Sequence, residues 1–336
     1  MKRAVPIACI AAAFAGCAAD TGSPPLQRSR PSPSLVAPSA VLSVEPWGFG
    51  DADGTVLRTR RYRVFTTSSR PILVERLPAF LEAALDHYQT SLTGNGPRLP
   101  EPPTKLDTYV MATRPQWATL TRTLMRDRAE LYLRIQRGGF AAAGRGVYRD
   151  LGSLNDTLNL AAHEGWHQYT QLAFRGRLPI YLEEGIATYM EGFRWDDRRP
   201  ELAVFLPWAN LERFRTLRAA EAAGRLMPLD ELVRSSPQSL IATDQDAALV
   251  WYAQVWALVH FLHEGDGGTH RAGLQRLLRD TAAGTSGTRR LGRRSDPFAP
   301  YFGTDPMTLD PAYQAFVRRI TAPGTQNAVT RGQSPL

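Results

Sequence analysis

The sequence predicts an α+β fold, in which a twisted mixed β-sheet with helices over one face precedes a helical C-terminal subdomain. Between residues 55 and 150, short segments rich in β-branched and aromatic residues alternate with amphipathic segments. After residue 154, apolar residues recur almost throughout at the intervals of three and four that are typical of helices. The chain has 336 residues, of which 43% are hydrophobic, and this is enough for a sizeable core.

The N-terminal region has the features of an export signal and a tether. A short positively charged start precedes the apolar run 4–14, which is too short to cross a bilayer, so residues 1–16 are predicted to be a signal peptide. Small residues stand directly before Cys17, an arrangement that resembles a bacterial lipoprotein box and implies lipidation of Cys17. The alternative is an ordinary secretory signal that is cleaved nearby. Residues 17–40 are rich in Pro, Ser and Ala, which indicates a flexible linker.

The cysteines and the net charge limit further which class of protein this can be. Cys9 would leave with the signal, so Cys17 would be the only thiol and a disulfide framework is excluded. The positive charges behind the net charge of +8 are almost all arginines. We interpret them as a solvated basic surface rather than as a contact site for anionic lipids. No nucleic-acid-binding module is recognisable. We therefore expect a cell-envelope protein that faces the periplasm or the exterior and is attached to a membrane through its N-terminal lipid only.

The strand and helix predictions follow from local patterns. Pro115 suits the first turn of a helix, Gly138-Gly139 is a turn signal, and Gly176 suits a helix end. The predicted strands are 55–66 and 106–111, with a hairpin or paired edge strands within 130–150. The predicted helices are 74–88, 115–125, 154–174, 179–193, 208–222, 246–264, 269–282 and 310–321, and residues 283–295 are a predicted surface loop.

Residues 163–167 read His-Glu-Gly-Trp-His inside one of these helices. His163 and His167 are four residues apart, so their rings lie on one face of the helix, where both could bind one zinc ion. Glu164 projects beside them and could accept a proton from a zinc-activated water rather than bind the metal. The pentapeptide alone arises by chance in about one chain in a hundred of this length. It therefore needs support from other residues.

That support comes from the helix predicted over 179–193, which is apolar over most of its circumference and should be buried. A carboxylate in such a helix is costly unless a cation neutralises it, and zinc would be that cation. Glu184 and Glu191 are seven residues apart and share one face, whereas Glu183 is rotated by about 100° from Glu184. One carboxylate could thus bind the metal, and Glu191 could steady a histidine ligand from behind.

His-Glu-x-x-His followed by a Leu-x-Glu-Gly-x-Ala helix resembles the gluzincins, in particular the peptidase MA-like families that include bacterial lipoproteins. The resemblance implies a zincin-like catalytic domain and one zinc ion per chain. It also implies Glu184 as the third metal ligand and Glu191 as the residue that supports a histidine ligand. The connection from His167 to Glu184 is slightly shorter than in the related aminopeptidases, so Glu183 is the alternative third ligand.

A further motif occurs in the helix predicted over 246–264. Residues 251–259 read Trp-Tyr-Ala-Gln-Val-Trp-Ala-Leu-Val, and aminopeptidases of the same superfamily carry a tyrosine in a similar Tyr-x-x-x-x-x-x-Val helix. The resemblance implies that the hydroxyl of Tyr252 stabilises the tetrahedral oxyanion, a role that a phenol donor can fill. The alternative is a structural helix that packs Tyr252 and Trp256 into the core.

Other polar residues are weaker candidates. The hairpin predicted within 130–150 could pair with an extended peptide by strand addition, although an ordinary structural hairpin is an equally good interpretation. Arg137, Arg145 and Arg149 could bind acidic groups of a substrate, but arginine is so frequent here that such a cluster is expected by chance. His260 is expected to be partly exposed or to cap its helix.

Together these features predict a zinc-dependent metallohydrolase, a metallopeptidase that acts on a peptide or protein substrate. Zinc would polarise the scissile carbonyl and activate a water, Glu164 would be the general base, and Tyr252 would support the oxyanion. No acidic motif that could hold a free amino terminus precedes His163, which favours an endopeptidase or a non-peptide amide hydrolase. The alternative function is a non-catalytic, zinc-containing envelope lipoprotein that acts as a binding or scaffold module.

The expected domain order follows from these assignments. It is a signal peptide (1–16), a lipidated cysteine with a flexible linker (17–40), a zincin-like α/β region (41–205), a helical C-terminal subdomain (206–322) and a disordered tail (323–336).

Overall fold

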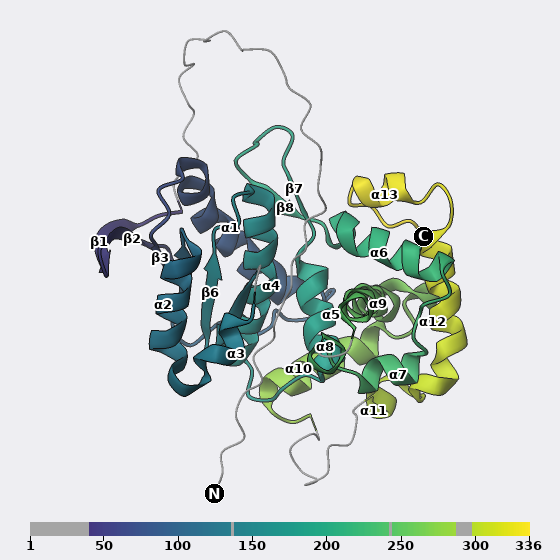
Figure 1. Cartoon of the computed structure of the whole chain (residues 1–336). Helices are drawn as coiled ribbons and strands as arrows, with labels where there is room; N and C mark the ends of the chain where they lie inside the picture. Colours follow the sequence, from purple (N-terminus) through teal and green to yellow (C-terminus); the bar gives the residue numbers. More distant parts are fainter. Residues whose placement is uncertain (1–39, 136–137, 242–243, 287–297) are drawn as a thin grey trace, which may run out of the picture.

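The computed structural model describes residues 40–135, 138–241, 244–286 and 298–336 (Figure 1). The expected signal peptide, Cys17 and nearly all of the linker lie outside these residues, as do Arg137 and most of the loop predicted over 283–295. Within the described ranges, none of the helices combines the length and the apolar character needed to cross a membrane.

The described strands form a mixed six-stranded sheet and a small two-stranded sheet. The large sheet has the order β1-β2-β3-β4-β6-β5, in which β4 runs parallel to both β3 and β6 and the other pairs are antiparallel. Its strands are β1 (Ser43–Phe49), β2 (Ala52–Arg58), β3 (Tyr62–Thr66), β4 (Leu106–Met111), β5 (Gly139–Ala142) and β6 (Arg145–Arg149). The small sheet pairs β7 (Phe193–Trp195) with β8 (Ala203–Phe205).

Helices accompany the sheet and then make up most of the C-terminal region, as the sequence predicts (Figure 1). Those of the first half are α1 (Pro71–Thr90), α2 (Arg114–Met125), η1 (Arg126–Arg128), α3 (Ala129–Leu133), α4 (Leu154–Ala173) and α5 (Ile180–Met190). Those of the second half are η2 (Pro207–Ala209), α6 (Leu211–Ala222), α7 (Leu229–Arg234), α8 (Pro237–Ile241), α9 (Gln245–Glu264), η3 (Asp266–Gly268), α10 (Arg271–Ala283), α11 (Phe298–Phe302), α12 (Pro306–Thr321) and α13 (Gln326–Thr330).

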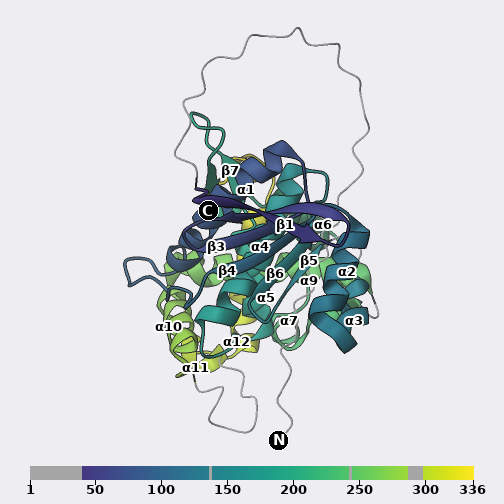
Figure 2. The ribbon, with the colours of Figure 1, turned by 90° about the vertical axis from the view of Figure 1, so that its left-hand side faces the viewer.

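The sheet has helices on both of its faces, so the expectation of helices over one face is wrong. Val110 of β4 belongs to the large buried cluster that includes α1 and α4. The next residue, Met111, belongs to a second buried cluster with Trp117 of α2 and Phe140 of β5. Successive side chains of a strand point to opposite faces, so α2 covers the face that α4 leaves open. Figure 2 views the molecule from the side on which the sheet and α2 lie.

One apolar core joins the sheet region to the C-terminal helices. The large cluster runs from Leu57 of β2 through the buried faces of α1, α4, α5 and α9 to Val329 of α13. Residues 323–336, expected to be a disordered tail, thus include a helix whose Val329 is fully buried. Arg194 also donates a hydrogen bond to the carbonyl oxygen of Thr330 at 2.6 Å. These contacts order α13, and the local sequence gives no sign of them.

Two predicted elements divide differently in the structure. The strand expected over 55–66 is interrupted by a turn between β2 and β3, where Glu82 of α1 accepts hydrogen bonds from the Thr59 hydroxyl and the Arg61 amide. The helix expected over 179–193 ends at Met190, and the chain then turns into β7 through Gly192, where an added Cβ would collide with the carbonyl oxygen of Leu206.

The turn before β3 gives a stability prediction. Glu82 also pairs with the Arg61 guanidinium at 2.6 Å; burial raises the pKa of Glu82, but these hydrogen bonds and the Arg61 charge lower it below its ordinary value overall. Glu82→Gln should therefore reduce the free energy of unfolding by about 1–3 kcal/mol at pH 7, measured with denaturant. Glu75→Gln, at an exposed position of the same helix, is the control and should change little.

The stabilisation that the Glu82 carboxylate provides should be lost at low pH. A carboxylate whose pKa is lower in the folded than in the unfolded chain stabilises the fold above its unfolded pKa, which is about 4.3 for glutamate. That stabilisation is lost as the pH falls through the folded pKa. The stability difference between wild type and Glu82→Gln should thus shrink below about pH 4; a difference that grew there would contradict this account.

Candidate metal centre

Helix α4 carries the His-Glu-x-x-His motif and is fixed by its ends and its glycine. The hydroxyl of Ser153 accepts the amide hydrogen of Asp156 and so caps the helix N-terminus. At Gly165, an added Cβ would lie 2.5 Å from the hydroxyl oxygen of Tyr88, which itself donates to the carbonyl oxygen of Ala162. The glycine inside the motif therefore lets α1 pack directly against α4.

Helix α5 brings the carboxylates and packs between α4 and α9. A Cβ at Gly185 would lie 2.7 Å from the carbonyl oxygen of Val255 on α9, so only glycine allows this close approach. The neighbouring Glu184 is fully buried and points toward α4. The Glu-Gly pair of the sequence motif thus has two roles, a carboxylate toward α4 and a close packing contact toward α9.

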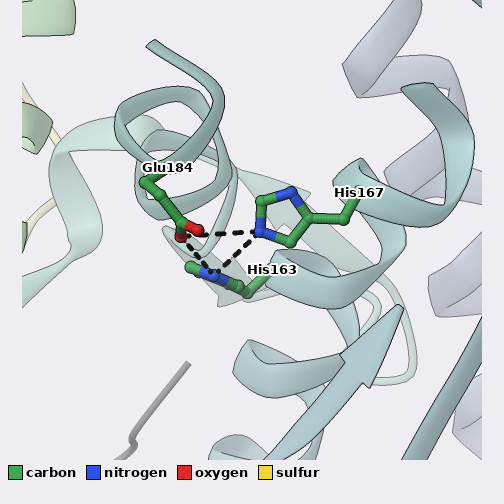
Figure 3. Close-up of side chains that lie close together, drawn as sticks. All are labelled: His163, His167 and Glu184. Carbon is green, nitrogen blue, oxygen red and sulfur yellow. Dashed lines mark hydrogen bonds and ion pairs between the residues drawn. The ribbon is translucent and has the colours of Figure 1, made fainter. Parts of the chain in front are cut away.

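His163, His167 and Glu184 converge in a triangle of ligand atoms (Figure 3). The two Nε2 atoms are 3.2 Å apart, and the Oε2 atom of Glu184 lies 3.4 Å from Nε2 of His163 and 3.6 Å from Nε2 of His167. Two ligand atoms that bind one zinc ion at tetrahedral angles are separated by about 3.4 Å. The triangle therefore has the dimensions that one metal ion requires.

Burial and charge agree with a metal site. All three side chains are at most 1% exposed, and neither carboxylate oxygen of Glu184 receives a hydrogen bond from the described residues. Burial raises the pKa of Glu184, but the two histidines lower it more, so the pKa lies well below its ordinary value. A buried carboxylate in the charged form needs a cation, and His163, His167 and Glu184 could hold one metal ion.

The second nitrogen of each histidine bonds to a further glutamate, one within α5 and one at its C-terminal end. Nδ1 of His163 lies 2.8 Å from Oε1 of Glu191, and Nδ1 of His167 lies 2.9 Å from Oε1 of Glu183. These bonds orient both rings so that Nε2 points to the metal position, an arrangement common to metal-binding histidines. Glu183, the alternative third ligand, is therefore occupied behind His167, and Glu184 alone of the pair faces the triangle.

The carboxylate of Glu191 accepts hydrogen bonds from three side chains. Its Oε1 atom accepts from Arg213 at 3.1 Å as well as from His163, and its Oε2 atom accepts from the side-chain amide of Asn210 at 2.7 Å. Burial raises the pKa of Glu191, but the Arg213 charge and these bonds lower it to about 2. The sequence singled out Glu191 but neither Arg213 nor Asn210, because both belong to α6 and no motif links them to α4.

Glu164 lies beside the triangle, near the backbone amide of Ala141 on β5. It is fully buried, and within the described residues neither of its carboxylate oxygens has a hydrogen-bond donor at normal distance and angle. Burial raises the pKa of Glu164 to about 7, against the lowering effect of the neighbouring histidines. A carboxylate in these surroundings can take up a proton readily.

The structure brings Tyr252 to the site and keeps His260 away from it. The ring of Tyr252 is buried, with its centroid 6.4 Å from that of His163. His260, expected to be partly exposed, is instead fully buried: it stacks on Trp208 at 3.7 Å, and its Nδ1 bonds to Glu264. It is part of the helical core.

Two glutamines of α4 attach the metal helix to the sheet edge. The side-chain amide of Gln168 donates to the carbonyl oxygens of Asp107 and Gly144, and that of Gln171 donates to the carbonyl oxygen of Ala141 on β5. The hairpin β5–β6 is therefore held beside Glu164. The sequence alone does not show this, since a glutamine on a helix carries no motif signal.

Arg145 and Arg149, the two described members of the predicted arginine cluster, lie on β6. Arg145 is exposed and lines a cavity between the hairpin and α3 that none of the triangle residues lines.

Comparison of the chain with protein-family models, with curated proteins and with solved structures finds no match. The buried triad of His163, His167 and Glu184, with two histidines on one helix and a glutamate on a later one, is consistent with a gluzincin.

The ligand assignment can be tested by metal content. Glu184→Gln should lower bound zinc from about one ion per chain to near zero after dialysis, because it removes a charged ligand. Glu183→Gln should keep the stoichiometry but weaken the affinity by about 10- to 100-fold, because it affects only the orientation of His167. Mass spectrometry of the metal and competition with a chelator measure the two quantities. The reverse pattern would make Glu183 the ligand.

Proposed function

We propose that the protein is a zinc-dependent hydrolase, a metallopeptidase of the gluzincin type with a zincin-like fold. The observation that carries this proposal is the buried triangle of His163, His167 and Glu184 beside the unpaired carboxylate of Glu164. Three protein ligands leave one position of a tetrahedral ion open, which is the pattern of catalytic rather than structural zinc sites. With one such site per chain, the proposal implies one zinc ion per chain.

Zinc held by this triangle would polarise the scissile carbonyl and make an attacking water acidic. Glu164 takes the proton of that water and delivers it to the leaving amine. Its suitability as the base rests on its burial and on its free carboxylate oxygens. Glu191 and Glu183 keep the two imidazole rings in position through Nδ1 and do not take part in the proton transfer.

The Tyr252 hydroxyl is proposed to donate a hydrogen bond to the oxyanion that forms when the water attacks. Its ring lies next to that of His163, on a helix that packs against the third ligand's helix. A phenol donor placed in a buried site stabilises developing negative charge more than it would in water.

A peptide is proposed as the substrate, aligned along β5. Within the described chain this strand pairs with no strand other than β6, and on its outer edge the carbonyl oxygen of Ala141 is bonded to Gln171. The hairpin turn at Ala143 and Gly144 has positive φ at both residues, which gives the tight two-residue connection that fixes the register. Strand addition at such an edge is a common way to bind peptides. An endopeptidase fits best, because extended binding does not require a free terminus.

The alternative, a zinc-containing envelope lipoprotein that binds a partner without turnover, is favoured by one observation. The three ligand residues are at most 1% exposed, as in closed structural sites. Incubation of the zinc-loaded protein with a mixed peptide library, with and without a chelator, separates the two. Cleavage that the chelator abolishes supports the enzyme, whereas no cleavage of varied peptides supports the alternative.

Attachment to a membrane through a lipid on Cys17, in the cell envelope, is a proposal that rests on residues 1–17 alone. Metabolic labelling with a fatty acid, compared between wild type and Cys17→Ser, tests it.

The role of Glu164 gives a sharp prediction. Glu164→Gln should bind close to one zinc ion per chain, because Glu164 is not a ligand, yet peptide hydrolysis should fall by about a hundredfold or more, because the general base is lost. Zinc content and kcat on a peptide that the wild type cleaves measure the two effects. Glu231→Gln, on the exposed face of α7, is the matched control. Retained hydrolysis in Glu164→Gln would refute the mechanism.

The role of Tyr252 gives a second prediction. Tyr252→Phe keeps the ring and removes the hydroxyl, so it should lower kcat by about 10²- to 10³-fold, the loss typical for one oxyanion donor. KM and zinc content should change little. Tyr189→Phe, which removes a hydroxyl from a buried tyrosine on α5, should keep full activity. Equal activity of both variants would show that Tyr252 acts only in packing.

A further inference from the structure

Arg213 is a buried cation that contacts two of the residues around the site. It lies in the first turn of α6, and only 6% of the residue is exposed. Its Nη2 atom is 3.1 Å from Oε1 of Glu191, and its guanidinium carbon is 5.3 Å from the centre of the Tyr252 ring. Burying an arginine is costly, and these contacts are what offset the cost.

Through Glu191, Arg213 is connected to His163, one of the proposed metal ligands. Oε1 of Glu191 is shared by Arg213 and by Nδ1 of His163, so the guanidinium and the imidazole meet on the same oxygen. Without the arginine, the Glu191 carboxylate would carry an uncompensated charge in the interior. Its Oε1 atom would then keep His163 as its only partner among the described residues, and the carboxylate could rotate away from the imidazole. Such a rotation weakens the bond that orients His163.

The contact with Tyr252 uses another part of the same group. A guanidinium is planar, so its edge can donate to a carboxylate while its face lies on an aromatic ring. The Tyr252 ring in turn lies edge-on to His163, with an interplanar angle of 66°. Lysine could replace the charge toward Glu191 but could not stack on the ring in the same way.

The other histidine ligand is supported differently. Glu183, which bonds to His167, accepts its second hydrogen bond from the Thr170 hydroxyl at 2.8 Å, and it makes no ion pair with an arginine within the described residues. Among the described residues, a buried arginine is thus found on the His163 side, which is also the side of Tyr252.

We propose that Arg213 is a positioning residue that couples the metal ligand His163 to the oxyanion donor Tyr252, through Glu191 on one side and the tyrosine ring on the other. This proposal rests on the proposed function, because the role of Tyr252 belongs to it. Arg213 itself touches neither metal nor substrate. It would set the distance and angle between the metal position and the phenol hydroxyl.

The experiment uses the full chain with Arg213→Met, Arg213→Lys and, as matched controls, Arg215→Met on the exposed face of α6 and Thr170→Val behind His167. Three quantities are measured: zinc affinity by competition with a chromogenic chelator, the visible absorption spectrum after loading with Co²⁺, and kcat and KM on a peptide that the wild type cleaves. The first two do not depend on activity.

The expected results separate the two contacts. Arg213→Met should weaken zinc affinity by about 10- to 100-fold and alter the Co²⁺ spectrum, because Glu191 no longer holds His163. Arg213→Lys should keep zinc affinity within about threefold but lower kcat at least tenfold with little change in KM, because the stack on Tyr252 is lost. Arg215→Met should match the wild type, and Thr170→Val should change zinc affinity more than the Lys variant does.

Several outcomes would overturn the proposal. Wild-type zinc affinity and spectrum in Arg213→Met would refute the Glu191 contact, and wild-type kcat in Arg213→Lys would refute the Tyr252 contact. If Arg213→Met does not fold, Arg213→Gln removes the same charge with a polar side chain and should show a loss of zinc affinity in the same direction; wild-type affinity would refute the Glu191 contact.

Failure of the proposed function gives a different pattern. A wild-type chain that binds no zinc refutes both the function and the role of Arg213. A chain that binds zinc but cleaves nothing refutes the hydrolase and the Tyr252 half of the proposal, whereas the affinity comparison still decides the Glu191 half.

Discussion

The hydrogen bonds from Nδ1 of the two histidines to glutamates of α5 are the constraint on which the site depends. Helix α5 supplies Glu183 to these bonds and Glu184 to the triangle, and Glu191 follows at its C-terminal end, so three carboxylates face two histidines of α4. Breaking bonds between polar groups in the interior is costly, which leaves little freedom for α5 to slide or rotate against α4. The register of the two helices therefore determines the geometry of the candidate metal position.

The C-terminal helices complete this arrangement rather than merely covering it. Gly185 lets α9 approach α5 closely and bring Tyr252 beside His163, and α6 provides Asn210 and Arg213 to the far side of Glu191. The apolar core is continuous through these helices. A division between the sheet region and the C-terminal helices would cut through the candidate site, since groups from both parts contact the residues that hold His163.

The edge of the sheet is also joined to the helix that carries the candidate metal ligands. Gln168 and Gln171 bond to the backbone of the sheet edge, so the same helix that holds the metal ligands also places β5 next to Glu164. Hydrogen bonds from a buried amide such as that of Gln168 fix relative position better than apolar packing does. An edge strand, the buried carboxylate of Glu164 and the candidate metal position consequently lie together although they come from separate parts of the chain.

Features that local geometry imposes could be predicted from the amino-acid sequence. The spacing of His163 and His167 places both on one helical face, because backbone hydrogen bonds fix 3.6 residues per turn, and the apolar surroundings of Glu184 indicate a buried carboxylate that needs a cation. The mixed sheet and the helical C-terminal region follow from the same periodicities. Four features could not be predicted in this way: Glu183 bonds to His167, Arg213 supports Glu191, helices cover both faces of the sheet, and the C-terminal residues include helix α13. These depend on how helices cross and which side chains then meet, and contacts between residues far apart in the chain leave no periodic pattern in its sequence.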